Sequence, residues 1–173
     1  MPAEQDTPVT QHFLTAALDD GAPGALTDHV DTLQLAWRAC RDRYPFTLTA
    51  GVILPDHLHC IVALPAKDPH RAARWGLLQE LFQHVVTGRS AGISLEERPL
   101  AGAAEIQRQV DFIHADPVRH GFVRMPRKWP YSSLHAYIAG GLRPLYWSGD
   151  VAGEYAARAA RGAACPAAAR SPR

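Results

Sequence analysis

The sequence has few cysteines, no long hydrophobic run and little net charge. Its three cysteines, Cys40, Cys60 and Cys165, form no C-x-x-C pair, so neither a disulfide framework nor a thiolate zinc site is expected. Uninterrupted apolar segments such as 60–65 fall far short of the roughly 20 residues that a membrane span needs. The N-terminus carries no basic segment followed by an apolar one, which a secretory signal would require. These absences predict a cytoplasmic protein with reduced cysteines and no membrane partner.

The net charge is only +1, although proteins that bind nucleic acid neutralise phosphates with lysine and arginine. Any nucleic-acid site must therefore be a local patch. A chain of 173 residues with 47% hydrophobic residues can bury one core of ordinary size, and it is too short for two full domains. We expect one domain over residues 11–150, with a disordered lead-in at 1–10 and an Ala/Arg/Pro-rich disordered tail at 151–173.

The hydrophobic pattern predicts an α+β fold. Alternating or β-branched apolar residues predict strands at 12–18, 46–54 and 57–64, with a short remnant strand at 93–95. Apolar residues at helical intervals predict helices at 28–44, 70–86, 103–116 and 132–138. Pro117 is expected to end the third helix, and Ser132 or Ser133 to cap the last one. This order fits a ferredoxin-like antiparallel sheet with helices on one face, followed by a C-terminal helical segment.

Two histidines, His57 and His59, lie two residues apart in the predicted strand 57–64. Residues at this spacing project from the same side of a strand, so the two imidazoles form a pair of candidate metal ligands. A Mg²⁺ or Mn²⁺ site would need an oxygen ligand beside them. The alternative is a pair of ordinary surface or core histidines. The same spacing also opens the metal site of amidohydrolase barrels, but those need about 250 residues.

A second motif-bearing block covers residues 110–138 and contains the stretch Phe112-Ile113-His114-Ala115-Asp116-Pro117-Val118. Together with the upstream stretch Leu54-Pro55-Asp56-His57-Leu58-His59-Cys60, it resembles the REP-associated tyrosine transposases, a branch of the His-hydrophobic-His (HUH) tyrosine transposases. The resemblance runs from His12 to Trp147 and is concentrated in these two blocks. It implies a ferredoxin-like sheet, a single-stranded or hairpin DNA partner, and nicking and rejoining of DNA in transposition.

The resemblance also assigns roles to individual residues. In the family, the histidines matched by His57 and His59 hold a divalent cation, Mg²⁺ or Mn²⁺, and a tyrosine on a later helix attacks the DNA. The family pattern Tyr-Ile-His-x-Asn-Pro-Val has Phe112 here in place of the nucleophile. Asp116 replaces the asparagine one helical turn later, where it is either an oxygen ligand of the cation or a plain helix-end aspartate.

Three further departures remove groups that a strand-transfer enzyme would use. Gln79 stands where the family pattern Trp-x-x-x-Lys has a lysine, so a phosphate contact is missing. The family's basic N-terminal arm is replaced by the acidic-to-neutral segment 2–11, and the aromatic strand before the motif helix is shortened to 92–101.

Positive charge is interleaved with aromatic residues after the motif, an arrangement that can stack on unpaired bases. The residues are Arg119, His120, Arg124, Arg127, Lys128, Trp129 and Tyr131. The alternative is that the aromatics pack against the core and the basic residues form a solvated rim. Tyr131, Tyr137, Tyr146 and Tyr155 also follow the motif, but the sequence does not place any of them at a phosphate.

The leading hypothesis is a transposase-like protein that keeps the cation site and some affinity for DNA but cleaves poorly or not at all. One alternative is a metal-dependent DNA hydrolase in which water replaces the tyrosine. Another is a repurposed module that binds a protein or DNA. Whether the chain is an enzyme depends on what stands beside the cation at Phe112.

Overall fold

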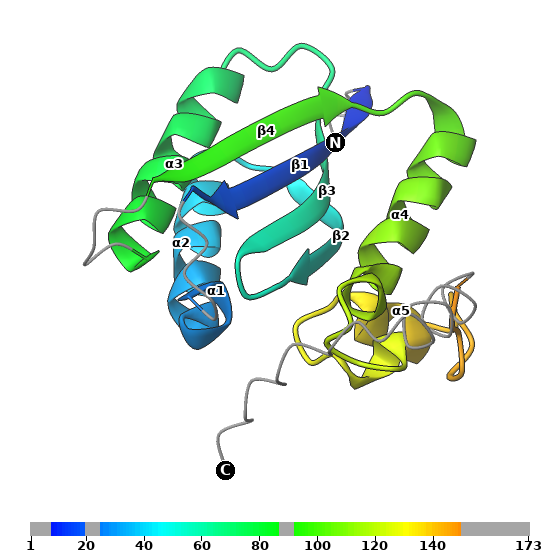
Figure 1. The fold of residues 1–173 in the computed structure, drawn as a ribbon. Coiled ribbons are helices and arrows are strands. Elements are labelled where there is room, and N and C mark those ends of the chain that lie inside the picture. Colours follow the sequence, from blue (N-terminus) through cyan, green and yellow to red (C-terminus); the bar gives the residue numbers. More distant parts are fainter. Residues whose placement is uncertain (1–7, 20–24, 87–91, 150–173) are drawn as a thin grey trace.

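A four-stranded antiparallel sheet forms the centre of the computed structural model, which describes residues 8–19, 25–86 and 92–149. The strand order is β2-β3-β1-β4 (Figure 1), which is the ferredoxin-like order, so the predicted fold class is confirmed. The strands are β1 (Val9–Leu18), β2 (Thr47–Ile53), β3 (His57–Pro65) and β4 (Ile93–Pro99). The predicted disordered segments at 1–7 and 151–173 lie outside the described residues.

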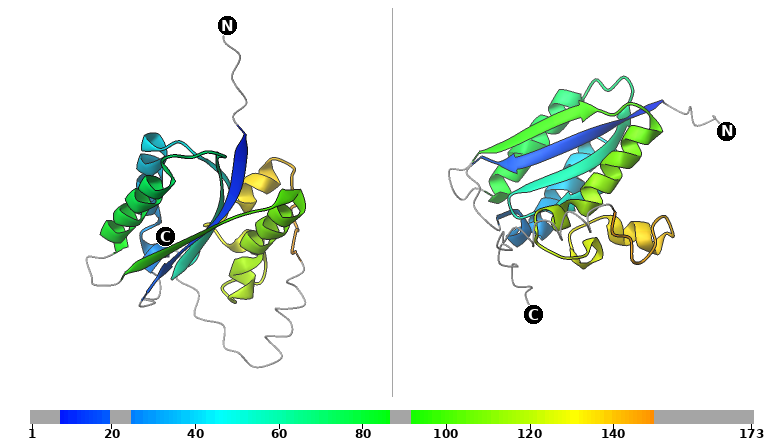
Figure 2. Two further views of the ribbon diagram at one scale, coloured as in Figure 1. Left: turned by 90° about the horizontal axis from the view of Figure 1, so that it is seen from above. Right: turned by 45° about the vertical axis from the view of Figure 1, so that its right-hand side comes forward.

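Helices cover both faces of the sheet. They are α1 (Ala25–Asp28), α2 (Val30–Arg43), α3 (Arg71–Val86), α4 (Gly102–Arg119) and α5 (Leu134–Ala139), with a 3-10 turn at Pro126–Lys128. Figure 2 shows α2 and α3 against one face, with α4 and α5 on the opposite side. The expected single layer of helices is therefore α2 and α3, and the C-terminal helical segment adds a second layer. None of the described helices has the length and hydropathy needed to cross a membrane.

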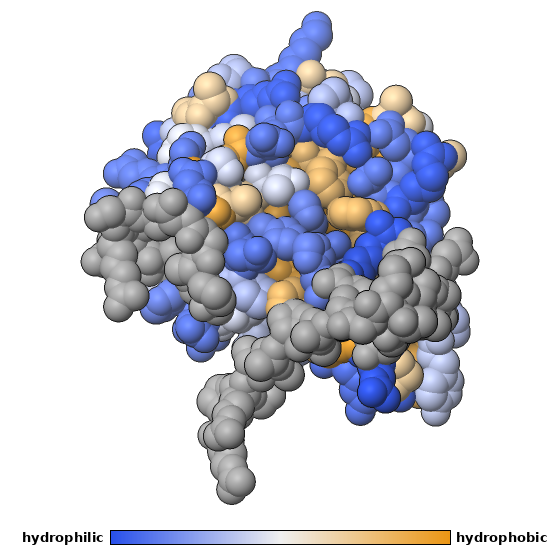
Figure 3. Space-filling view, in the orientation of Figure 1, coloured by the Kyte–Doolittle hydropathy of each residue, from blue (hydrophilic) through white to orange (hydrophobic). Residues whose placement is uncertain are grey.

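Alternation along β3 divides the core into two halves. Leu58, Cys60 and Val62 pack toward α2 and α3, whereas Ile61 packs toward α4. Because side chains alternate, His57 and His59 share the α4 side with Ile61. The face seen in Figure 3 is mostly hydrophilic, with apolar side chains gathered between the strands and α4.

The predicted remnant strand at 93–95 is a full strand of seven residues, β4. It pairs with β1 from Ile93 opposite Leu18 to Pro99 opposite His12. Its charged residues, Glu96, Glu97 and Arg98, obscure the strand pattern. The Glu97 carboxylate is buried and pairs with His12 on β1 and with Arg71 and Trp75 on α3. At the other end, β1 begins at Val9, inside the expected lead-in.

The expected end of the motif helix at Pro117 is wrong, because α4 continues through this proline to Arg119. Proline lacks only its own N–H, so in the last turn it removes a single helical hydrogen bond. Pro117 and Val118 are both buried, and the Pro117 carbonyl accepts a hydrogen bond from the Phe122 N–H at 2.9 Å. Packing and this bond outweigh the local preference, and they place His120 directly after the helix.

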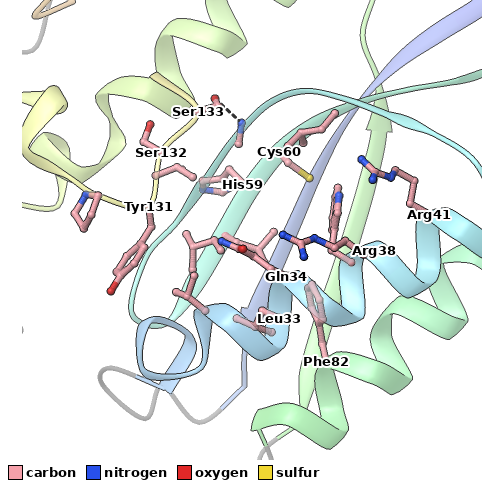
Figure 4. Close-up of a pocket in the computed structure, with 18 residues that line it drawn as sticks. Leu33, Gln34, Arg38, Arg41, His59, Cys60, Phe82, Tyr131, Ser132 and Ser133 are labelled. Carbon is pink, nitrogen blue, oxygen red and sulfur yellow. Dashed lines mark hydrogen bonds between the residues drawn. The ribbon is translucent and has the colours of Figure 1, made fainter. Parts of the chain in front are cut away.

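The segment that follows the 3-10 turn seals the outer edge of β2. The Ile53 N–H donates to the Tyr131 carbonyl at 2.9 Å, and the Trp129 Nε1–H donates to the Ile53 carbonyl at 2.8 Å. The Gly51 N–H donates to Ser133 Oγ at 2.9 Å (Figure 4), and the Tyr137 hydroxyl donates to the Thr49 carbonyl at 2.9 Å. These bonds satisfy backbone groups that an edge strand would otherwise expose.

The predicted serine cap of the last helix needs correction for Ser133. Ser133 occupies the N-cap position of α5 but makes no side-chain cap, because its hydroxyl is used by β2. Ser132 Oγ instead accepts the Leu134 N–H at 3.2 Å. Neither serine lies in the metal centre described below.

Candidate metal centre

The candidate centre forms where the start of β3 meets the last two turns of α4. His57 and His59 project from β3 toward this helix. On α4, Phe112, Asp116 and His120 recur every four residues, which places them on one stripe of the helix. The sheet therefore supplies two imidazoles, and the helix supplies a carboxylate and a third imidazole.

The Asp116 carboxylate lies at the middle of the cluster and is 2% exposed. Its Oδ2 is 3.4 Å from His57 Nε2 and 3.8 Å from His59 Nε2, and its Oδ1 is 3.6 Å from His120 Nε2. Ligand atoms of His57, Asp116 and His120 all lie within 4.8 Å of one another. Of the sequence-predicted ligands, His57, His59 and Asp116 thus come together.

These separations fit a bound cation. Ligands about 2.1 Å from a metal ion are roughly 3.4 Å apart when tetrahedral and about 4.2 Å apart when opposite each other. The spacings between Asp116 and the three imidazoles, 3.4 to 3.8 Å, fall between these values. The donor set is mixed nitrogen and oxygen, as divalent first-row metals accept.

Hydrogen bonds orient both β3 histidines for metal binding. His57 Nδ1 lies 2.7 Å from Asp56 Oδ1, and His59 Nδ1 lies 2.9 Å from the hydroxyl of Thr15, its cross-strand neighbour on β1. Both rings therefore turn Nε2 toward Asp116. A partner on the second ring nitrogen, often a carboxylate, is the usual arrangement around a metal-bound histidine.

The electrostatics of the two β3 histidines differ. Burial lowers the pKa of His59 to about 4, because the neighbouring His57 and His120 add to the effect of burial and Asp116 offsets only part of it. Burial also lowers the pKa of His57, but hydrogen bonds to Asp116 and Asp56 outweigh it and leave that pKa raised. His59 is therefore neutral at pH 7, the form in which imidazole binds a metal.

Phe112, at the position of the family's nucleophile, forms one wall of the centre. Its ring centroid is 5.5 Å from that of His59 and 6.2 Å from that of Phe13. The Arg119 guanidinium lies over the ring, 5.1 Å from its centroid. The side chain at the position of the family's nucleophile thus has no oxygen with which to attack a phosphate.

The other tyrosines that follow the motif have packing roles where the structure describes them. The Tyr137 hydroxyl donates to Thr49 on β2, and burial raises the pKa of this phenol. The Tyr131 ring packs edge-on against Trp129 with centroids 5.9 Å apart. Tyr146 is 75% exposed, and Tyr155 lies outside the described residues.

The residues predicted to contact DNA separate into three groups. Trp129 is 7% exposed and its indole is bonded to Ile53, which favours the packing interpretation, as does the half-buried Tyr131. Arg127 is half-buried with its guanidinium over the Tyr146 ring. The exposed members are Arg119, His120, Arg124 and Lys128.

His120, which was predicted to contact DNA, lies beside Asp116 in the candidate metal centre; the DNA contact stays a prediction. The sequence did contain the signal, because His120 follows Asp116 by four residues and so continues the stripe that begins at Phe112. Because the helix was expected to end at Pro117, His120 was not assigned to the same helix face as Asp116.

A groove of about 400 Å³ lies on the other side of the sheet edge, between α2 and β2. Figure 4 shows Gln34, Arg38 and Arg41 along its α2 side and Tyr131 near its opposite end. His59 borders the groove, but its Nε2 lies toward Asp116. The groove and the metal centre are therefore separate surfaces. Gln79, expected to mark a lost phosphate contact, donates to the Ile93 carbonyl and ties α3 to β4.

Comparison with known proteins identifies close relatives. The chain is 34% identical to the REP-associated tyrosine transposase of Escherichia coli (strain K12) over 141 residues, covering 80% of this chain and 85% of the relative. It is 29% identical over 154 residues to a provisionally assigned REP-associated tyrosine transposase of Haemophilus influenzae, covering 80% and 88%. A solved REP-associated tyrosine transposase bound to a REP hairpin superposes with a TM-score of 0.75 at 32% identity, covering 82% of this chain and 87% of that one. No protein-family model matches the sequence.

Proposed function

Because the chain belongs to the REP-associated tyrosine transposase family, we propose that it binds single-stranded or hairpin DNA in the cytoplasm and holds a divalent cation. We further propose that it forms little or no covalent link to DNA, since Phe112 stands at the nucleophile position. The solved relative was captured on a REP hairpin, which supports a folded DNA ligand. The single observation that carries the proposal is Phe112 beside His59 on the stripe of Asp116.

Different residues would bind the cation and contact the DNA in such a protein. His57, His59 and Asp116 would hold Mg²⁺ or Mn²⁺, which would polarise a phosphate and steady charge on a leaving oxygen. The exposed Arg119, Arg124 and Lys128 follow on from the same helix and would contact phosphates near the centre. Phe112 excludes water from one side of the imidazoles but cannot form a phosphotyrosine.

A labelled stem-loop oligonucleotide incubated with the protein and Mn²⁺ tests this proposal. We expect a retarded complex on a native gel but no covalent adduct on a denaturing gel. The variant Phe112→Tyr is expected to produce an adduct, at least about tenfold above the wild-type background, because it restores the hydroxyl at the family position.

The matched control is Phe122→Tyr, which adds the same oxygen to a ring that stacks on His120 at 6.1 Å but lies off the helix stripe. No adduct is expected from it. Robust adducts from the wild-type protein would refute the proposal, as would equal adduct formation by both variants.

A second candidate function is metal-dependent hydrolysis of DNA, in which water attacks in place of tyrosine. It is favoured by the donor set of three imidazoles and one carboxylate at a centre whose nucleophile position is apolar. Cleaved products with free ends and no attached protein, lost in His57→Ala, would support hydrolysis over the first proposal.

A further inference from the structure

His120 lies beyond the family pattern that ends at Val118, and several contacts hold it beside the candidate centre. Its backbone N–H donates to the Asp116 carbonyl at 2.9 Å, and its ring stacks on Phe122 with planes 17° apart. The ring centroid is 4.9 Å from that of His57. These contacts place an imidazole of the helix end beside an imidazole of the strand.

We propose that His120 is a ligand of the cation and that it makes the site selective for Mn²⁺ and later first-row transition ions over Mg²⁺. The site then has three imidazoles, from His57, His59 and His120, and one carboxylate from Asp116. This inference deepens the proposed cation site and rests on it, but it does not depend on DNA cleavage.

The position of the carboxylate supports the assignment. Asp116 directs Oδ2 toward the two strand histidines and Oδ1 toward His120, so the carboxylate lies between the imidazoles from the two elements. Ligand atoms of His57, Asp116 and His120 are mutually within 4.8 Å, only a little beyond the roughly 4.2 Å that separates opposite ligands of one ion. The His120 side chain is 45% exposed, so it has room to close this difference.

The donor chemistry gives the selectivity. Mg²⁺ demands oxygen ligands, dehydrates reluctantly and usually keeps several waters. Imidazole suits the first-row transition ions, whose affinity for nitrogen sites rises from Mn²⁺ toward Cu²⁺. A third imidazole therefore raises the affinity for transition ions and does little for Mg²⁺. Asp116, at the position of the family's asparagine, adds the negative charge that balances part of the ion's charge.

Metal binding to the purified full chain tests the proposal without any DNA. The protein is stripped with a chelator and titrated with MnCl₂ or MgCl₂, with binding followed by calorimetry and by the electron paramagnetic resonance signal of free Mn²⁺. We expect one Mn²⁺ per chain, an affinity for Mg²⁺ at least about a hundredfold weaker, and a loss of roughly tenfold or more in Mn²⁺ affinity for His120→Asn.

Pulsed electron paramagnetic resonance of bound Mn²⁺ separates a ligand from a merely structural residue, because it counts coordinated imidazole nitrogens. Three are expected in the wild type and two in His120→Asn. The control is His84→Asn, an exposed histidine on α3, which should bind like the wild type. Circular dichroism melting of each variant verifies that it is folded.

The outcomes distinguish this inference from the proposed function. A wild-type protein that binds neither ion would remove the cation site itself. A wild type that binds Mn²⁺ through two imidazoles, or a folded His120→Asn that retains wild-type affinity, would overturn the role of His120 and leave the cation site in place. Equal affinity for Mg²⁺ and Mn²⁺ would overturn the selectivity.

Discussion

Phe112 differs from tyrosine by one oxygen atom, and the family's attack on a DNA phosphate requires that atom. The ring packs beside His59 and under Arg119. The candidate ligands His57, His59 and Asp116 stand at other positions on β3 and α4. In the proposed function, cation binding and strand transfer therefore depend on different residues.

His114, the histidine of the stretch 112–118, points away from the candidate metal centre. We expect it to make the free energy of unfolding depend on pH. It is fully buried, its Nε2 lies 2.9 Å from Ser133 Oγ, and burial, aided by Arg143, lowers its pKa to about 4 from 6.5. The unfolded chain therefore takes up this proton first as the pH falls. The stability that His114 contributes is complete above about pH 6.5 and is lost as the pH approaches about 4.

We expect the free energy of unfolding of the metal-free protein to fall between about pH 7 and about pH 4.5 by on the order of 2–3 kcal/mol more in the wild type than in His114→Gln. Urea unfolding at the two pH values measures the difference. The pKa of His59 is also lowered to about 4, but His59 is present in both proteins, so its effect on the free energy of unfolding cancels in the comparison. An identical pH dependence in the two proteins would contradict this account of His114.

At the scale of elements, the edge of β2 depends on the segment from Trp129 to Tyr137. Ser133 is central to it, because its hydroxyl accepts the Gly51 N–H and also pairs with His114 on α4. It joins the sheet to the helix that carries Phe112 and Asp116. This connection means that the motif after α4 contributes to the placement of the centre without contacting it.

Replacing Ser133 with alanine leaves the Gly51 N–H without its acceptor and is expected to destabilise the fold by about 1–3 kcal/mol. Thermal or urea unfolding gives the change, and hydrogen exchange of the Gly51 amide gives its location. Ser148→Ala is the matched control, since Ser148 is exposed and its hydroxyl donates to the adjacent Gly149 carbonyl. Equal stability of the two variants, with a protected Gly51 amide in both, would contradict a stabilising role for the hydrogen bond from Gly51 to Ser133.

The elements with strong hydrophobic periodicity were predictable from the sequence, and the exceptions have physical causes. β3 and α3 were placed within a residue or two because their apolar spacing is regular. β4 was predicted as a remnant because its charged residues hide the strand pattern, and the partners that hold Glu97, namely His12, Arg71 and Trp75, come from other elements. Pro117 misled the prediction of the end of α4 because burial of Pro117 and Val118 is a tertiary effect.

The candidate site was predictable only in part for a related reason. The pairing of His57 with His59 follows from strand geometry alone, and Asp116 required the family pattern. His120 could be found only by continuing the four-residue spacing beyond Pro117. The hydrogen bond between Thr15 and His59 depends on the register of β1 against β3, and no local pattern in the sequence predicts this register.

At the scale of the whole molecule, the net charge of +1 limits how the chain can hold DNA. Affinity from phosphate contacts falls with salt in proportion to the number of phosphates neutralised. The exposed basic residues after the centre, Arg119, Arg124 and Lys128, would neutralise only a few. The salt dependence of hairpin binding is therefore expected to be shallow.

The two lysines of the chain, Lys67 and Lys128, provide a matched test of this patch. Lys128→Ala is expected to weaken hairpin binding and to reduce the slope of log K against log salt by about one. Lys67→Ala removes the same charge from the exposed turn after β3 and should leave the slope unchanged. Fluorescence anisotropy over a range of salt concentrations gives both slopes; equal slopes would place the DNA elsewhere on the molecule.

Peptide mapping by mass spectrometry, after incubation with a stem-loop oligonucleotide and Mn²⁺, tests the central claim most directly. The account predicts no DNA-linked peptide from the wild-type protein, and a DNA-linked peptide containing residue 112 from Phe112→Tyr. A wild-type peptide linked to DNA through any of the chain's own tyrosines would contradict it.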